Sequence, residues 1–359
     1  MSTKRTAWII LVVVAIAIKV FSLFPAAVEQ YYSTGIYPAI AGALRILLGW
    51  LPFSVGDILY GLAIIYLLVK LVGLVKRLFK RKANKQYWLT GLRRTVFIAL
   101  WVYILFNVLW GLNYNRQGIA TQLQLKIETY TAQELGDVMQ ELVTKLNAYD
   151  SSGRLTRSSL AKKRNLFEGA KLAYENLKKQ QPAFEYNFSS VKPSLYSYLG
   201  NYLGYTGYYN PFTGEAQVNT TVPLFIQPFT TCHEIGHQLG YAKENEANFA
   251  GYLSAKSSTN PAFLYSVYFD LYDYSRYYLY LMDSVQLRQL DSQLHVGIKS
   301  DYAELKDFVR RHRNPLERVI DKLYGQYLKA NEQPAGRLSY NEVVAWLVAY
   351  YKKYGKAAL

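Results

Sequence analysis

The sequence predicts an α+β fold, mostly helical, in which a soluble domain follows an N-terminal region of three transmembrane helices. Apolar residues of the 359-residue chain are concentrated before about residue 112, in runs long enough to cross a bilayer core of roughly 30 Å. The remainder mixes charges, tyrosines and turn residues, as water-soluble domains do. Within it, helical apolar spacing dominates on both sides of one segment, residues 193–221, whose short alternating pieces and turn residues predict strands.

Three segments have the length and apolar character of membrane spans: residues 7–24, 55–75 and 95–112. The first has a basic amino-terminal flank, as a signal peptide would, but it lacks a small-x-small cleavage pattern. We therefore expect it to remain as an anchor. Residues 36–51 are apolar but shorter and contain Arg45, which predicts an interfacial or re-entrant helix. Residues 1–113 together form the expected membrane region.

The net charge of +16 comes largely from the stretch between the second and third spans. Residues 76–94 contain eight lysines and arginines and no acidic residue. This pattern is typical of a cytoplasmic loop that fixes orientation and contacts anionic lipid head groups, so the bilayer is the expected partner and nucleic acid is not. Three spans then place residues 114–359 outside the cytoplasm.

The soluble domain begins with a clear helix signal. Thr131 and Glu134 have capping-box spacing, and the helix that follows is expected to end near Tyr149, where residues 150–153 would break it. A second helix is expected over residues 158–179. After the strand segment, helical patterns resume at about residue 228 and continue towards the carboxyl terminus.

The segment 230–240 contains a His-Glu-x-x-His motif made by His233, Glu234 and His237. On a helix this spacing puts both imidazoles on one face, where they can bind Zn²⁺ from the same side. Glu234 would then lie beside a metal-bound water and act as a general base. The alternative is structural, because Thr231 and Glu234 also have capping-box spacing.

A third ligand is expected just downstream, because Gly240 can end the motif helix and let the chain return in another helix. Glu246 shares a helix face with Phe249 and Ala250, and a carboxylate on such an apolar face is costly unless it is paired or bound to metal. Glu244 lies on a different face. The prediction is therefore Glu246 rather than Glu244. Three ligands with an open fourth position are typical of catalytic zinc, and a single cysteine argues against a closed structural site.

Several motifs together resemble one known family. They are Trp110–Arg116, Asn210–Glu215, Pro228–Thr230, His233–His237 and Glu244–Phe249. In this combination the chain is similar, over nearly its whole length, to a bacterial membrane family labelled domain of unknown function 3810. The resemblance implies three amino-terminal spans before a zincin-like domain, located in the bacterial cytoplasmic (inner) membrane.

The segment Glu246–Ala250 is also similar to one in the ImmA/IrrE type of zinc peptidase, in which the glutamate before Ala-Asn is the third metal ligand. This likeness implies Glu246 as the ligand here. The family resemblance further implies an edge strand beside the zincin cleft, to which an extended peptide could add by backbone pairing. The residues concerned are Glu215, Ala216, Gln217, Val218 and Asn219.

These features predict a membrane-anchored zinc hydrolase, a metallopeptidase whose partner is a peptide or protein substrate. Two alternatives stay open, a noncatalytic envelope scaffold stabilised by zinc and a zinc hydrolase of a nonpeptide amide. A scaffold would have no need of Glu234 as a base. Arg276, Tyr277 and Tyr278 are candidates for stabilising the transition-state oxyanion, since they form a polar-tipped group on a helix after the motif.

Overall fold

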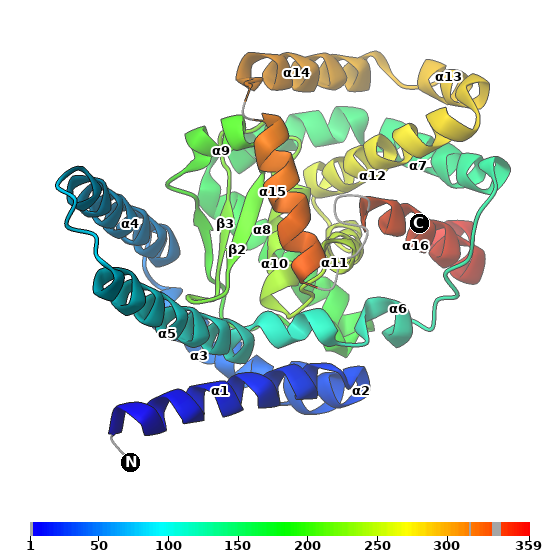
Figure 1. The fold of residues 1–359 in the computed structure, drawn as a ribbon. Helices are drawn as coiled ribbons and strands as arrows, with labels where there is room; N and C mark the ends of the chain where they lie inside the picture. The colour runs from blue at the N-terminus through cyan, green and yellow to red at the C-terminus, as the bar shows by residue number, and fades with distance from the viewer. Residues whose placement is uncertain (1–2, 316, 332–338) are drawn as a thin grey trace.

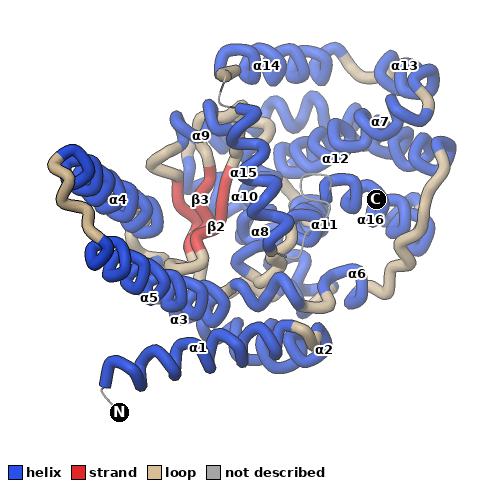
Figure 2. Tube along the Cα trace, viewed as in Figure 1, coloured by secondary structure: helices blue, strands red, loops and turns tan. Residues whose placement is uncertain are grey.

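The computed structural model describes residues 3–315, 317–331 and 339–359. Most of these residues are helical, and a single small sheet lies among the helices (Figure 2). The amino-terminal elements are α1 (Thr3–Ser22), α2 (Pro25–Ala27), a π-helical segment (Val28–Ile36), α3 (Tyr37–Leu48), α4 (Val55–Phe79) and α5 (Lys85–Leu109). The next are α6 (Gly118–Gln122), α7 (Ala132–Arg157), α8 (Lys163–Gln180), β1 (Val191–Pro193), α9 (Ser197–Leu203), β2 (Gly207–Asn210) and β3 (Glu215–Val218). The last are α10 (Gln227–Gln238), α11 (Glu244–Lys256), α12 (Pro261–Met282), α13 (Ser284–Ser292), α14 (Val296–His312), α15 (Glu317–Ala330) and α16 (Ser339–Tyr354).

Three described helices, α1, α4 and α5, are long and apolar enough to cross a membrane. The helix α5 begins at Lys85, ten residues before the predicted span, because the Asn84 side chain caps it by accepting from the Tyr87 amide at 2.9 Å. In Figure 1, α4 and α5 form two arms. Residues 80–84, called the basic turn below, join the far ends of these two helices. The short α3 is not among the candidate spans, and its buried residues are Tyr37, Ala41 and Arg45.

The soluble region is a helical layer built around α10 (Figure 1). The capping box of Thr131 and Glu134 is confirmed at the start of α7. The predicted break at residues 150–153 is wrong, since α7 continues to Arg157. Two contacts explain the continuation: Asp150 pairs with Arg154 one turn later at 2.9 Å, and Gly153 lets α7 approach α12, because a Cβ there would lie 2.8 Å from the Tyr265 Cβ.

The sheet has the strand order β1-β3-β2, with β3 parallel to β1 and antiparallel to β2. The prediction that residues 215–219 form an edge strand is therefore wrong. The strand β3 is central, paired on both sides and buried along its length. Its burial reflects Glu215, whose carboxylate accepts from the Val55 and Gly56 amides at the first turn of α4, at 3.1 and 2.6 Å. The edge strand next to the motif helix is β2.

Candidate metal centre

The motif residues lie in the middle of α10. Pro228 is in the first turn, where its missing N–H costs no hydrogen bond. Thr231 lies inside the helix and donates its hydroxyl to the Gln227 carbonyl at 2.7 Å. Thr231 therefore does not begin a helix, and the capping interpretation of Glu234 is wrong. His233 and His237 lie one turn apart, with ring centroids 4.8 Å from each other.

The Nδ1 atom of each imidazole forms a hydrogen bond with a neighbouring polar group. His233 Nδ1 lies 2.8 Å from the Asn248 Oδ1, and His237 Nδ1 lies 2.8 Å from the Tyr241 carbonyl. Both partners are acceptors, so each Nδ1 carries a proton, and in the neutral imidazole each Nε2 presents a lone pair. This arrangement orients a histidine as a metal ligand.

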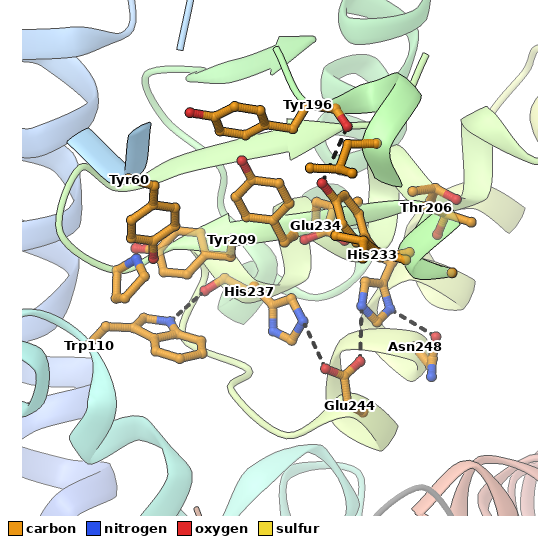
Figure 3. A pocket seen from close by; sticks show the side chains of 18 of the residues that line it. Tyr60, Trp110, Tyr196, Thr206, Tyr209, His233, Glu234, His237, Glu244 and Asn248 are labelled. Atoms are coloured by element: carbon orange, nitrogen blue, oxygen red, sulfur yellow. Dashed lines mark hydrogen bonds and ion pairs between the residues drawn. The ribbon is translucent and has the colours of Figure 1, made fainter. Parts of the chain in front are cut away.

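Glu244 faces both histidines (Figure 3). Its carboxylate oxygens lie 3.4 Å from His233 Nε2 and 3.9 Å from His237 Nε2. Small residues make this approach possible: a Cβ on Gly251 would lie 3.0 Å from the His233 backbone nitrogen, and one on Gly236 would lie 3.2 Å from the Ala250 Cβ. The face of α11 that carries Glu244 therefore packs directly on α10.

Glu246 does not face the histidines, contrary to the prediction that Glu246, rather than Glu244, is the third metal ligand. Its carboxylate lies against Gly118, where a Cβ would be 1.8 Å from Oε1 and φ is +78°. Burial raises the pKa of Glu246 to about 7, against the opposing charges of Lys243 and Arg116. The apolar face of α11 thus holds a buried carboxyl group beside Arg116. The α11 carboxylate that faces the histidines is that of Glu244.

Glu234 is the buried acidic residue of the motif. His233, Glu234 and His237 offer ligand atoms within 4.8 Å of one another. The Glu234 side chain is 3% exposed, and its Oε2 has no hydrogen-bond partner among the described residues. Burial raises the pKa of Glu234 to about 8, although the nearby His233 lowers it. A desolvated carboxyl group of this kind can exchange a proton near neutral pH.

The two histidines differ in their electrostatic surroundings. Burial and the neighbouring His233 lower the pKa of His237 to about 4, so its imidazole is neutral and can bind a cation. Burial alone would lower the pKa of His233 as well. The hydrogen bond to Glu244 and the charges of Glu234 and Glu244 raise it instead. A metal ion at Nε2 would replace the proton that these carboxylates favour.

A cavity of about 1010 Å³ opens in front of these groups, and β2 forms part of its wall. Arg276, Tyr277 and Tyr278 do not line it. Arg276 pairs with Asp291 at 2.7 Å, and Tyr277 is 59% exposed. The prediction that these three residues stabilise an oxyanion is therefore wrong. The helix α12 instead contributes Asp270 and Tyr274 to the cavity, and both residues precede Arg276 in the helix.

Asn248, Tyr241 and Asp270 are the site residues that sequence reasoning missed. Asn248 is four residues after Glu244, so the two share a face of α11, but the spacing does not show that this face meets the motif helix. Tyr241 acts through its backbone carbonyl, which has no sequence signature. Asp270 lies on a long aromatic helix, and its Oδ2 has no hydrogen-bond partner among the described residues.

A family model described as a protein of unknown function, DUF3810, matches residues 32–348. The chain belongs to the DUF3810 family. No curated protein and no solved structure matches the chain. The matched range includes α4 and α5 as well as α10 and α11, so the two apolar helices and the candidate site fall within one family match.

The motif Trp110–Arg116 of this DUF3810 chain closes the end of α10. Trp110 Nε1 donates to the His237 carbonyl at 3.0 Å, and Arg116 Nη1 donates to the Gly240 carbonyl at 3.1 Å. The final carbonyls of a helix have no partner within it, so outside donors stabilise the helix end. Arg116 is held in turn by Glu29, at 2.7 and 2.9 Å.

Donors from α3 complete this arrangement. The Tyr37 hydroxyl and Arg45 Nη1 both donate to the Gln238 carbonyl, at 2.9 and 3.1 Å. Gly240, at φ +85°, turns the chain back towards α11, as the sequence predicts. The amino-terminal region therefore supports the motif helix directly.

Proposed function

We propose that this protein is a membrane-embedded, zinc-dependent hydrolase of zincin-like design, and specifically a metallopeptidase. His233, His237 and Glu244 are the proposed zinc ligands, and Glu234 is the proposed general base. The expected location is the bacterial cytoplasmic membrane, with the site on the extracytoplasmic side.

One observation carries the proposal: both Nε2 atoms of the motif face a single carboxylate, while both Nδ1 atoms are occupied. Two imidazoles and one carboxylate are a ligand set used by catalytic zinc sites, and the open side faces the cavity. The chemistry of the donors thus fits the metal.

Bound zinc would lower the pKa of a coordinated water to roughly 7 and polarise a substrate carbonyl. The chain's own residues supply the rest. Glu234 accepts the proton of the attacking water and can return it to the leaving amine. Asn248 and the Tyr241 carbonyl hold the imidazoles in the tautomer that binds metal.

The strand β2 can align a peptide at this site. It pairs with β3 on one side, and no other strand among the described residues pairs with its outer edge. A Cβ on Gly207 would lie 2.6 Å from Glu234 Oε1, so the strand passes directly beside the general base. An extended peptide that pairs with this edge would bring its carbonyl groups to Glu234.

The placement of charge supports an extracytoplasmic site. All eight basic residues of the 76–94 stretch are exposed. This stretch runs from the last turn of α4 into the first ten residues of α5, on the side where the two helices are joined (Figure 1). The site lies at the other ends, where Glu215 holds the start of α4 and Trp110 follows the end of α5. If α4 and α5 cross the bilayer, the basic turn and the site lie on opposite sides, and basic loops stay in the cytoplasm.

A scaffold stabilised by zinc would require neither the cavity nor a buried base with an unpaired oxygen. The experiment is therefore zinc analysis of the purified full-length protein, combined with an unbiased peptide-cleavage screen. We expect about one zinc per chain, loss of cleavage after chelation and recovery with added zinc. Cleavage that persists without metal would contradict the proposal, and so would zinc-loaded protein that cleaves only nonpeptide amides.

A further inference from the structure

The cavity in front of the histidines continues between α4 and α5, two of the three long apolar helices. Tyr60, Ala63, Ile64 and Leu67 of α4 line it, as do Val102 and Phe106 of α5. Its charged side chains, Glu234, Glu244 and Asp270, all lie at the end that holds the histidines. The cavity therefore has one polar end and one apolar end.

The part of α4 that lines the cavity is exposed to the surroundings. Every residue from Leu62 to Gly73 is exposed, so the rest of the described protein buries none of this stretch. Where α4 crosses a membrane, this side of the cavity opens directly into the hydrocarbon. A substrate can thus enter sideways from the bilayer.

The depth of the cavity corresponds to one leaflet. Asp57 lies at the boundary with the soluble region, where its carboxylate accepts from the Leu195 amide at 2.6 Å. Leu67 is ten residues further along α4, or about 15 Å at the rise of an α-helix. This is half of a hydrocarbon core of roughly 30 Å.

The cavity is large enough for a substrate with two parts. Its volume is about 1010 Å³, at the upper end of the roughly 300–1,000 Å³ of ligand pockets. An acyl chain fits the apolar end and leaves room for a peptide group at the polar end.

We propose that the substrate is a lipid-anchored peptide or protein. Its acyl chain lies between α4 and α5, and its peptide part reaches His233, Glu234 and His237. This inference rests on the proposed zinc hydrolase function and names the class of substrate. The anchor enters from the leaflet that borders the soluble region.

The test uses two hydroxamates, which bind zinc through the same group: acetohydroxamate and its hexadecanoyl counterpart. Their affinities are measured on zinc-loaded, full-length protein in vesicles of phosphatidylethanolamine and phosphatidylglycerol. Leu67→Trp fills the apolar end. Leu68→Trp is the matched control, because Leu68 is the next residue, is similarly exposed and does not line the cavity.

We expect the hexadecanoyl compound to bind more tightly than acetohydroxamate. Leu67→Trp should reduce the ratio of the two affinities about tenfold, the loss expected when about two buried methylene groups are displaced. Leu68→Trp should leave the ratio unchanged. Equal ratios in the two variants would overturn the lipid anchor and leave the zinc hydrolase intact, since acetohydroxamate still reports the metal.

A third probe distinguishes an acyl chain from a membrane helix. A hydroxamate attached to a single transmembrane peptide that binds more tightly than the hexadecanoyl compound would also overturn the inference. Failure of acetohydroxamate itself to bind zinc-loaded protein would overturn the proposed function, and this inference with it.

Discussion

At the scale of single residues, the carboxylate that faces both histidines of the motif belongs to Glu244 and not to Glu246. The prediction of Glu246 rests on the cost of a carboxylate on an apolar helix face unless it is paired or bound to metal. In the structure that face meets Arg116 and Gly118. Glu244 lies on the face with Ala247 and Gly251, and small residues allow the closest approach between helices. Backbone proximity, which the spacing of polar residues does not reveal, determines which glutamate faces the histidines.

The first prediction compares the two glutamates. Glu244→Gln should weaken zinc binding by about 100-fold or more, because loss of even an outer-shell partner costs roughly 10- to 100-fold. Glu246→Gln should retain zinc, since its carboxylate lies at Gly118 and not at the histidines. Competition with a fluorescent chelator measures both affinities. The opposite ranking would restore Glu246 as the ligand.

At the scale of elements, helix starts were predictable where a side chain caps the backbone, as Thr131 and Glu134 do for α7. Helix ends and strand positions depended on distant contacts. The helix α7 continues past residue 150 because Gly153 packs against Tyr265, and β3 is central because Glu215 binds the start of α4. Alternation along residues 215–219 indicates a strand but does not state how many neighbours it has.

The second prediction concerns the carboxyl end of α10. Tyr37→Phe removes a buried hydroxyl that donates to the Gln238 carbonyl, and it should lower the free energy of unfolding by about 1 kcal/mol. Tyr31→Phe is the matched control, because Tyr31 is 60% exposed. Thermal unfolding of zinc-loaded protein measures the difference. Equal stability of the two variants would mean that this cap contributes nothing to the motif helix.

At the scale of the whole molecule, the sequence predicts three apolar helices and a mostly helical soluble region, and the structure confirms both. It did not predict how closely the two regions are joined. Tyr37, Arg45, Trp110 and Arg116 all lie before or just after residue 113, and each donates to a carbonyl at the end of α10 or in the turn after it. Such contacts join residues more than 100 positions apart, which local patterns do not record.

The third prediction tests orientation. Reporter fusions at Lys85 and at the carboxyl terminus should lie on opposite sides of the membrane, because the exposed basic turn stays in the cytoplasm. The fusion partners should be one enzyme that is active in the cytoplasm and one that is active only outside it. Signals from the same side would contradict three spans and place the site with the basic turn.

The central claim is that Glu234 acts as a base at a zinc ion. The most direct measurement is turnover by Glu234→Gln on a substrate from the cleavage screen, with zinc content determined on the same sample. Glu246→Gln is the matched control, because it replaces another buried carboxylate in the adjacent helix.

We expect Glu234→Gln to keep its zinc and its fold while turnover falls by roughly 10²- to 10⁴-fold, the usual contribution of a general base. Glu246→Gln should keep most of its turnover. A zinc-loaded Glu234→Gln protein that cleaves at the parental rate would contradict the mechanism.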